Sequence, residues 1–307
     1  MSLIGGVTVS LSGCLSEGSP SETTSGVDGG SVISEAEADI GYATRHIAEE
    51  ASFEFARQPS ISIRTGTISL ALNDADVALD RASNSDSSVP KEEIQVYQDY
   101  VQALRMWTDS LESAEEALDT LSAAEAYRKT ERYDDAIKQT VSARDIFINV
   151  SETAVSAREK FNQINFDMIG PDSIDYGEMK EVNKSFVELV STYKRYTTAT
   201  IPYYRGLESY WGAVEAYGNG QYSAVSADLN DASNQFELAK SRYQDAERAV
   251  SASARSVFIK QTCLADAMYE SSEFLIKASF ERQNNNAGQA REFVDQAVAA
   301  RKELCQV

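Results

Sequence analysis

Residues 97–121, YQDYVQALRMWTDSLESAEEALDTL, decide the fold of this chain. Large or apolar side chains recur there every three or four positions: Tyr97, Tyr100, Leu104, Trp107, Leu111, Ala114, Leu118 and Leu121. This spacing places them along one stripe of a helix, which we call a seam. The seam predicts a long helix packed nearly parallel or antiparallel to its neighbours.

Three further seams repeat the spacing, over residues 136–164, 182–217 and 222–250. No segment alternates polar and apolar residues, so the sequence predicts no strands. We therefore expect an all-α fold: an elongated bundle of antiparallel helical hairpins with coiled-coil-like seams.

Helix breakers and gaps in the seams place the turns. The expected helices cover about 34–57, 61–83, 90–128, 132–164, 174–217, 221–252, 254–283 and 288–304. The Gly170-Pro171 pair divides N-terminal hairpins (34–165) from C-terminal ones (166–307), and the two parts can also pack as one continuous domain. Pro202 lies inside the third seam, where we expect a kink.

Three windows that follow turns share a residue pattern. They are Tyr133-x2-Ala136-x6-Ala143, Gly220-x-Tyr222-x2-Val225-x6-Ala232 and Gly288-x-Ala290-x2-Phe293-x6-Ala300. The pattern resembles the start of the second helix in tetratricopeptide repeats, where small residues let two helices approach closely. The seams exceed one such repeat, so the resemblance implies tetratricopeptide-like hairpins rather than a regular solenoid. Convergent hairpin geometry is the alternative.

The charge balance excludes one class of partner. The chain carries 48 acidic and 28 basic side chains, a formal net charge of −20. Nucleic acids require clustered basic residues, so we expect no nucleic-acid partner. The acidic surface favours adaptation to high salt, as in halophiles. An ordinary acidic protein and cation binding at carboxylate clusters remain alternatives.

The amino terminus indicates location. Residues 1–13 are uncharged and mostly apolar or small, and they end in Leu11-Ser12-Gly13 before Cys14. This tetrapeptide resembles the lipobox of secreted lipoproteins, which implies cleavage of a signal-peptide remnant (1–13) and lipid attachment at Cys14. That pattern begins with a basic segment, whereas the first basic residue here is Arg45, so we expect the true start codon to lie upstream.

A Ser/Gly-rich segment over residues 14–33 follows, and we expect a disordered tether there. Together, the lipobox, the tether and the charge resemble the acidic surface lipoproteins of halophilic archaea. The resemblance implies a lipid-anchored protein on the extracytoplasmic face of the cell membrane.

Two cysteines remain for a disulfide. Cys263 and Cys305 are equidistant from Asn284, within the strongest turn signal of the carboxyl third. Residues equidistant from the turn of an antiparallel hairpin lie side by side, which favours a Cys263–Cys305 bond in an exported protein. Two small buried thiols are the alternative.

Candidate catalytic and metal sites are sparse in this sequence. The single histidine, His46, pairs at helical spacing with Glu50, but a metal site needs three or four ligands. No nucleophile elbow or phosphate loop is present. We predict no catalytic residue, no cofactor and no metal site.

Seven aromatic residues crowd into 25 positions. They are Tyr193, Tyr196, Tyr203, Tyr204, Tyr210, Trp211 and Tyr217. An aromatic core is the first interpretation and an interface the second, because Tyr and Trp are common anchors in both. Tyr204 and Trp211 lie off the third seam, so we expect a second face that contacts either another helix or a partner, with these two residues as the possible partner face.

The sequence favours a noncatalytic, membrane-anchored scaffold or binding lipoprotein that presents helix faces to an envelope protein. An extracytoplasmic hydrolase-like enzyme with a carboxylate or tyrosine site is the alternative, as is a ligand-binding lipoprotein, although no α/β lobes are indicated. Homo-oligomerisation through a residual apolar stripe is also open.

Overall fold

A computed structural model describes residues 29–51, 64–84, 89–168 and 176–303 of the chain. These residues form α1 (Gly29–Glu50), α2 (Thr65–Asn84), α3 (Lys91–Lys129), α4 (Tyr133–Gln163), the short 3-10 helix η1 (Phe166–Met168), α5 (Tyr176–Gly218), α6 (Tyr222–Ala249), α7 (Ala252–Gln283) and α8 (Ala287–Glu303). No strand occurs in this part of the chain, so the predicted all-α fold is confirmed.

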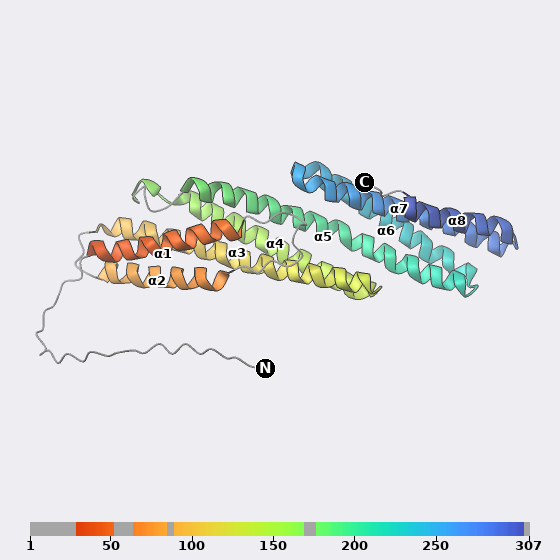
Figure 1. Cartoon of the computed structure of the whole chain (residues 1–307), viewed down its shortest axis with the longest axis horizontal. Coiled ribbons are helices and arrows are strands. Elements are labelled where there is room, and N and C mark those ends of the chain that lie inside the picture. Colours follow the sequence, from red (N-terminus) through yellow and green to blue (C-terminus); the bar gives the residue numbers. More distant parts are fainter. Residues whose placement is uncertain (1–28, 52–63, 85–88, 169–175, 304–307) are drawn as a thin grey trace, which may run out of the picture.

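The helices form an elongated stack of hairpins (Figure 1). Each helix packs against the next one in the sequence, and the long α5 also contacts α1 and α7. The short α1–α2 hairpin lies beside the first part of α3, and the α7–α8 hairpin lies beside α6 (Figure 1). The rods are therefore joined side by side along their length.

The predicted seams form the core, with one shift. Seam positions 97–118, 136–161 and 225–250 are all buried. In α5, however, Val190, Thr197 and Tyr204 are buried, whereas the seam residues Leu189 and Tyr203 are only partly buried. The reason is that α5 packs against α4 on one side and α6 on another, so its buried face is wider than a single stripe.

Helix α5, which follows the predicted boundary at residues 165–166, contributes to two groups of buried residues. The first half of α5, including Phe186 and Tyr193, packs with α1 to α4. The second half, including Leu207 and Tyr210, packs with α6 to α8 and with the turn between α3 and α4. Helix α5 thus contributes to both groups of buried residues, and the division into two parts or one continuous domain stays a prediction.

Helix α5 continues through Pro202, and a neighbouring helix compensates for the missing donor. A proline lacks the N–H that would bond to the carbonyl four residues earlier, here that of Thr198. Arg242 of α6 donates to that carbonyl through Nη1 at 2.9 Å. The carbonyl is satisfied, so the helix spans 43 residues without interruption.

Three turns share one backbone geometry. A residue of positive φ lies two positions after the end of each of the helices α3, α5 and α7: Glu131 at 60°, Gly220 at 77° and Asn285 at 60°. In each turn the next residue donates its N–H to a carbonyl five positions earlier, which defines a Schellman motif. This equivalence aligns Ala290 and Ala297 with Ala136 and Ala143, so the third predicted window was placed three residues too late.

The predicted tether extends too far into the folded part. Helix α1 begins at Gly29, and Val32 and Ile33 are buried against the core. Burial of these apolar side chains stabilises the first turns of the helix. The rest of the tether, residues 14–28, lies outside the described residues, as do the signal-peptide remnant at 1–13 and Cys14.

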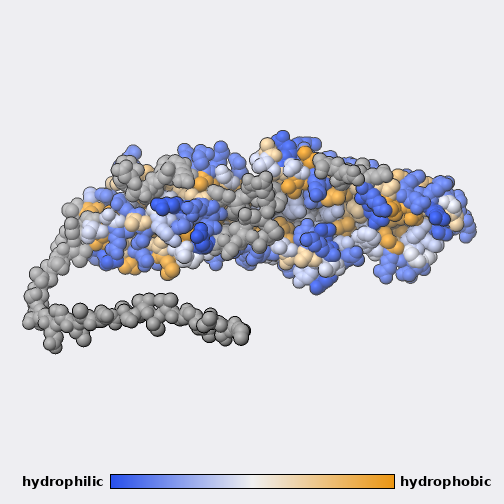
Figure 2. All heavy atoms as spheres, viewed as in Figure 1, coloured by the Kyte–Doolittle hydropathy of each residue, from blue (hydrophilic) through white to orange (hydrophobic). Residues whose placement is uncertain are grey.

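The visible surface is mostly hydrophilic, with scattered apolar side chains (Figure 2). Among the described helices, none combines the length and apolar character needed to cross a bilayer.

Candidate functional site: an acidic aromatic cleft

A cleft of about 600 Å³ lies between the α3–α4 turn and α5. One wall is the turn and the start of α4, and the other is the last part of α5. The lining residues are Glu131, Arg132, Tyr133, Asp134, Asp135, Glu208, Trp211, Gly212, Val214 and Glu215. This volume lies in the range of small-ligand sites, roughly 300–1,000 Å³.

Unequal helix lengths create the cleft. The α3–α4 hairpin ends level with residues 208–215 of α5, while α5 continues to Gly218. Gly212 adds space: a Cβ built there would meet nothing within 4 Å, whereas one at Gly206 would lie 2.7 Å from the ring of Phe236. Gly206 therefore belongs to close helix packing, and Gly212 to an open wall.

Trp211 supplies the aromatic surface of the cleft. It is partly buried, and its ring contacts Tyr210 edge-on at 5.3 Å. Arg301 of α8 lies over the Trp211 ring at 5.2 Å and over the Tyr210 ring at 5.5 Å. The guanidinium and the neighbouring ring restrict the indole, so Trp211 is a preorganised part of the wall.

The cleft is strongly acidic. Its lining includes five carboxylates (Glu131, Asp134, Asp135, Glu208, Glu215) and one cation, Arg132. Arg132 pairs with Asp135 at 2.6 Å, and Lys138, just outside, pairs with Asp134 at 2.6 Å. Among the described residues, the other three carboxylates form no ion pair.

The carboxylates help to raise the pKa of two neighbouring groups. Burial and the Glu131 carboxylate raise the pKa of Tyr133, while Arg128 opposes them. The hydrogen bond to Asp134 raises the pKa of Lys138, with further contributions from Asp135 and Glu208. The carboxylates of the turn and of α5 thus act on the same region of space.

Tyr204 does not belong to the predicted partner face. Only 2% of its surface is exposed, and it packs in the core with Leu207 and Phe236. For Tyr204 the other of the two expectations describes the structure, because this part of the second face of α5 is covered by a neighbouring helix. Trp211, the other residue of that face, does reach the surface, in the cleft.

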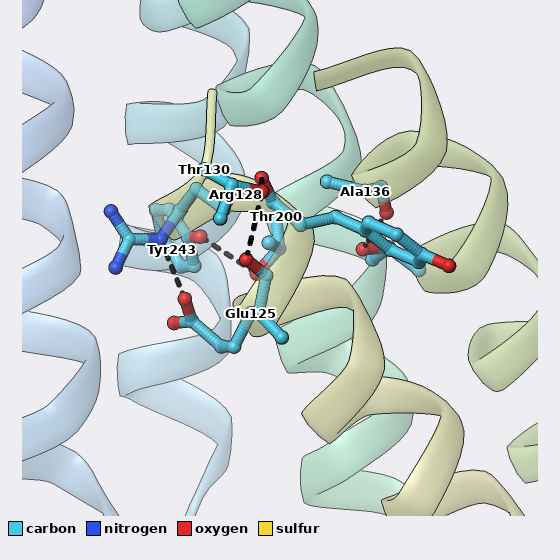
Figure 3. Close-up of polar contacts among 9 residues, drawn as sticks. Glu125, Arg128, Thr130, Ala136, Thr200 and Tyr243 are labelled. Carbon is cyan, nitrogen blue, oxygen red and sulfur yellow. Dashed lines mark hydrogen bonds and ion pairs between the residues drawn. The ribbon is translucent and has the colours of Figure 1, made fainter. Parts of the chain in front are cut away.

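The remaining tyrosines support the first interpretation, an aromatic core. The hydroxyl groups of Thr200 and Tyr243 hydrogen-bond at 2.8 Å, near the Arg128–Glu125 ion pair at the end of α3 (Figure 3). Tyr210 similarly shares a hydrogen bond of 2.7 Å with Ser271. These hydroxyls satisfy one another inside the bundle.

A second groove lies between α1 and α2. It measures about 440 Å³ and is lined by Glu35, Ala38, Asp39, Asp74, Val77 and Arg81. Burial, followed by the charges of Asp74 and Glu35, raises the pKa of Asp39. The groove is smaller than the cleft and contains no aromatic side chain, so it offers less contact surface to a ligand.

The single histidine and Glu50 are engaged with different partners. His46 contacts Glu49 at 3.0 Å and the Tyr42 ring at 4.2 Å, while Glu50 pairs with Arg64 at 2.9 Å. No group of three or more potential metal ligands occurs in the described segments.

Cys263, on α7, is disulfide-bonded. Both other cysteines of the chain, Cys14 and Cys305, lie outside the described residues, so the identity of its partner stays a prediction.

The sequence predicted a role for Trp211 but not for the other residues that line the cleft. Glu208 and Glu215 lie three residues before and four after Trp211, so helical spacing alone places them on one face of α5. Tyr133 and Asp134 reach the same cleft only because the α3–α4 turn stops at this level. No local pattern encodes that tertiary register.

Comparison of the chain with protein-family models, curated proteins and solved structures finds no match.

Proposed function

We propose that the chain is a noncatalytic binding scaffold of the cell envelope, which holds a protein partner in the cleft between the α3–α4 turn and α5. The observation that carries the proposal is the cleft itself. It combines a partly exposed Trp211, open space beside Gly212 and three carboxylates without an ion-pair partner among the described residues. Tryptophan is enriched at protein interfaces and at their energetic hot spots.

The arrangement of the rods suits this role. The helices pack side by side, and the cleft between them is open to the surface rather than enclosed. A partner can therefore approach without any rearrangement of the bundle. We propose accordingly that the bundle positions the partner and performs no chemistry on it.

The proposed location follows from the sequence. The lipobox-like residues ending at Cys14 support a lipid anchor on the extracytoplasmic face, and the acidic surface supports a saline environment.

The anchor is tested by the intact mass of the mature protein from its native membrane. Wild-type protein should carry the added mass of a lipid, and Cys14→Ser should lack it and leave the membrane fraction. Equal masses and equal distribution would remove the anchor from the proposal.

The scaffold role is tested by crosslinking in native membranes at high salt, followed by capture of the full-length protein. We expect one envelope protein, or a second copy of this chain, to be recovered reproducibly. Turnover of a small molecule without any recovered protein would overturn the scaffold in favour of an enzyme.

A further inference from the structure

The cleft has the chemistry of a receptor for a guanidinium group. We infer that, as an extension of the proposed function, it takes an arginine side chain from an exposed segment of the partner. The argument rests on charge complementarity, on the aromatic wall and on how this molecule already holds its own arginines.

Charge complementarity is the first step. The lining carries five carboxylates against one guanidinium, and Glu131, Glu208 and Glu215 have no ion-pair partner in the described part of the chain. A cation from the partner would approach favourably and would offset the repulsion among these groups. An acidic or neutral segment would leave that repulsion in place.

The aromatic wall selects the kind of cation. A planar guanidinium can stack on an indole and bind a carboxylate with two parallel hydrogen bonds, which a compact ammonium group cannot do. Glu208 and Glu215 flank Trp211 on α5, so both types of contact are available within two helical turns. The wall therefore fits arginine better than lysine.

The molecule itself places two of its own arginines over aromatic rings next to the cleft. Arg301 of α8 lies over Trp211 at 5.2 Å, and Arg132 lies over the Tyr127 ring at 4.5 Å. Arg132 also pairs with Asp135 at 2.6 Å. An incoming arginine would repeat a combination of ring and carboxylate that already exists in this turn.

Trp211 supplies a built-in reporter. The chain has two tryptophans, and the other, Trp107, is fully buried against Phe186 in the first half of the bundle. The probe is the peptide acetyl-Gly-Arg-Gly-Arg-Gly-amide, and its control replaces both arginines by citrulline, a neutral side chain of nearly the same shape. Full-length protein is titrated with each peptide at low and at high salt.

We expect the arginine peptide to shift the tryptophan emission and to bind at least about tenfold more tightly than the citrulline peptide, a difference of about 1.4 kcal/mol. Binding should weaken with added salt. Equal affinities for the two peptides, or no response to either, would overturn the inference.

Two matched pairs of variants locate the response. Gly212→Phe should abolish it by filling the cleft, whereas Gly212→Ala should retain it. Glu208→Gln combined with Glu215→Gln should weaken binding about tenfold or more, whereas Glu237→Gln, on the exposed face of α6, should not. Circular dichroism confirms that each variant is folded, and equal binding by both members of a pair would contradict the assignment.

Failure of this inference is distinguishable from failure of the proposed function. If Gly212→Phe abolishes capture of the envelope partner while arginine and citrulline peptides behave alike, the cleft is a docking site of different chemistry. If Gly212→Phe captures the partner normally, the cleft is not the docking site, and both ideas are wrong.

Discussion

Arg242 Nη1 of α6 lies 2.9 Å from the carbonyl oxygen of Thr198 in α5, the oxygen that Pro202 leaves without its helical donor. A side chain from a neighbouring helix thus completes the backbone bonding of the longest helix. The pair links the packing of α5 and α6 to the continuity of α5.

This relationship predicts coupling between Arg242 and Pro202. Arg242→Met should destabilise the protein by about 1–2 kcal/mol, because a partly buried carbonyl loses its donor. In a Pro202→Ala background the backbone N–H replaces the lost donor, so the same change should cost less. Urea unfolding of the four proteins gives the coupling energy. A coupling of zero would mean that Arg242 acts independently of Pro202.

The register of the last hairpin predicts the disulfide partner of Cys263. Ser271 Oγ of α7 donates to the carbonyl of Ala297 in α8 at 2.9 Å, and these residues are equidistant from Asn284. Positions 263 and 305 are also equidistant from Asn284, so continuation of this register pairs the two cysteines. Peptide mapping without reduction should recover a Cys263–Cys305 peptide.

The same bond should stabilise the hairpin. We expect Cys305→Ser to lower the unfolding free energy by about 2–4 kcal/mol. A Cys263–Cys14 peptide in the map would contradict both the pairing and the assignment of Cys14 to a lipid.

The position of Glu131 predicts that replacing it with glycine raises the stability of the protein and weakens binding in the cleft. It has φ of 60° at a helix end where Gly220 and Asn285 occupy the equivalent positions, and a side chain costs about 1 kcal/mol or more in this conformation. Glu131→Gly should therefore raise the unfolding free energy by about 1 kcal/mol, and Gly220→Ala should lower it similarly. Because Glu131 lines the cleft, Glu131→Gly should also weaken binding of the arginine peptide. A more stable variant with unchanged binding would show that Glu131 has no role in the cleft.

The tyrosine core predicts loss of stability in alkali. Burial raises the pKa of Tyr196 and of Tyr203 to about 12, against about 10 in an unfolded chain. Between these values the unfolded state releases protons that the folded state retains, so the unfolding free energy falls as the pH rises from about 10 to 12. Tyr203→Phe should reduce that slope in urea unfolding series. If the dependence of the unfolding free energy on pH were unchanged in Tyr203→Phe, the loss of stability would come from groups other than Tyr203.

Residue spacing was sufficient to predict the helices and their order, because each seam has to be buried along its whole length. It failed where one helix serves two neighbours: Tyr204 lies off the expected stripe of α5 but is buried. It also failed at the third turn. The predicted window was aligned on Gly288, whereas the residue with positive φ in that turn is Asn285. The cleft was predictable only in part, since Trp211 depends on local sequence while Tyr133 depends on where the α3–α4 hairpin ends.

The central claim is that this cleft holds the partner, and the most direct test compares capture by two variants at one position. Gly212→Phe and Gly212→Ala are expressed as full-length proteins and crosslinked in native membranes, and the yield of the captured envelope protein is quantified. We expect wild-type yield from Gly212→Ala and a loss of at least about tenfold from Gly212→Phe, because only the larger side chain fills the space beside Trp211. Equal yields from the two variants would contradict the account.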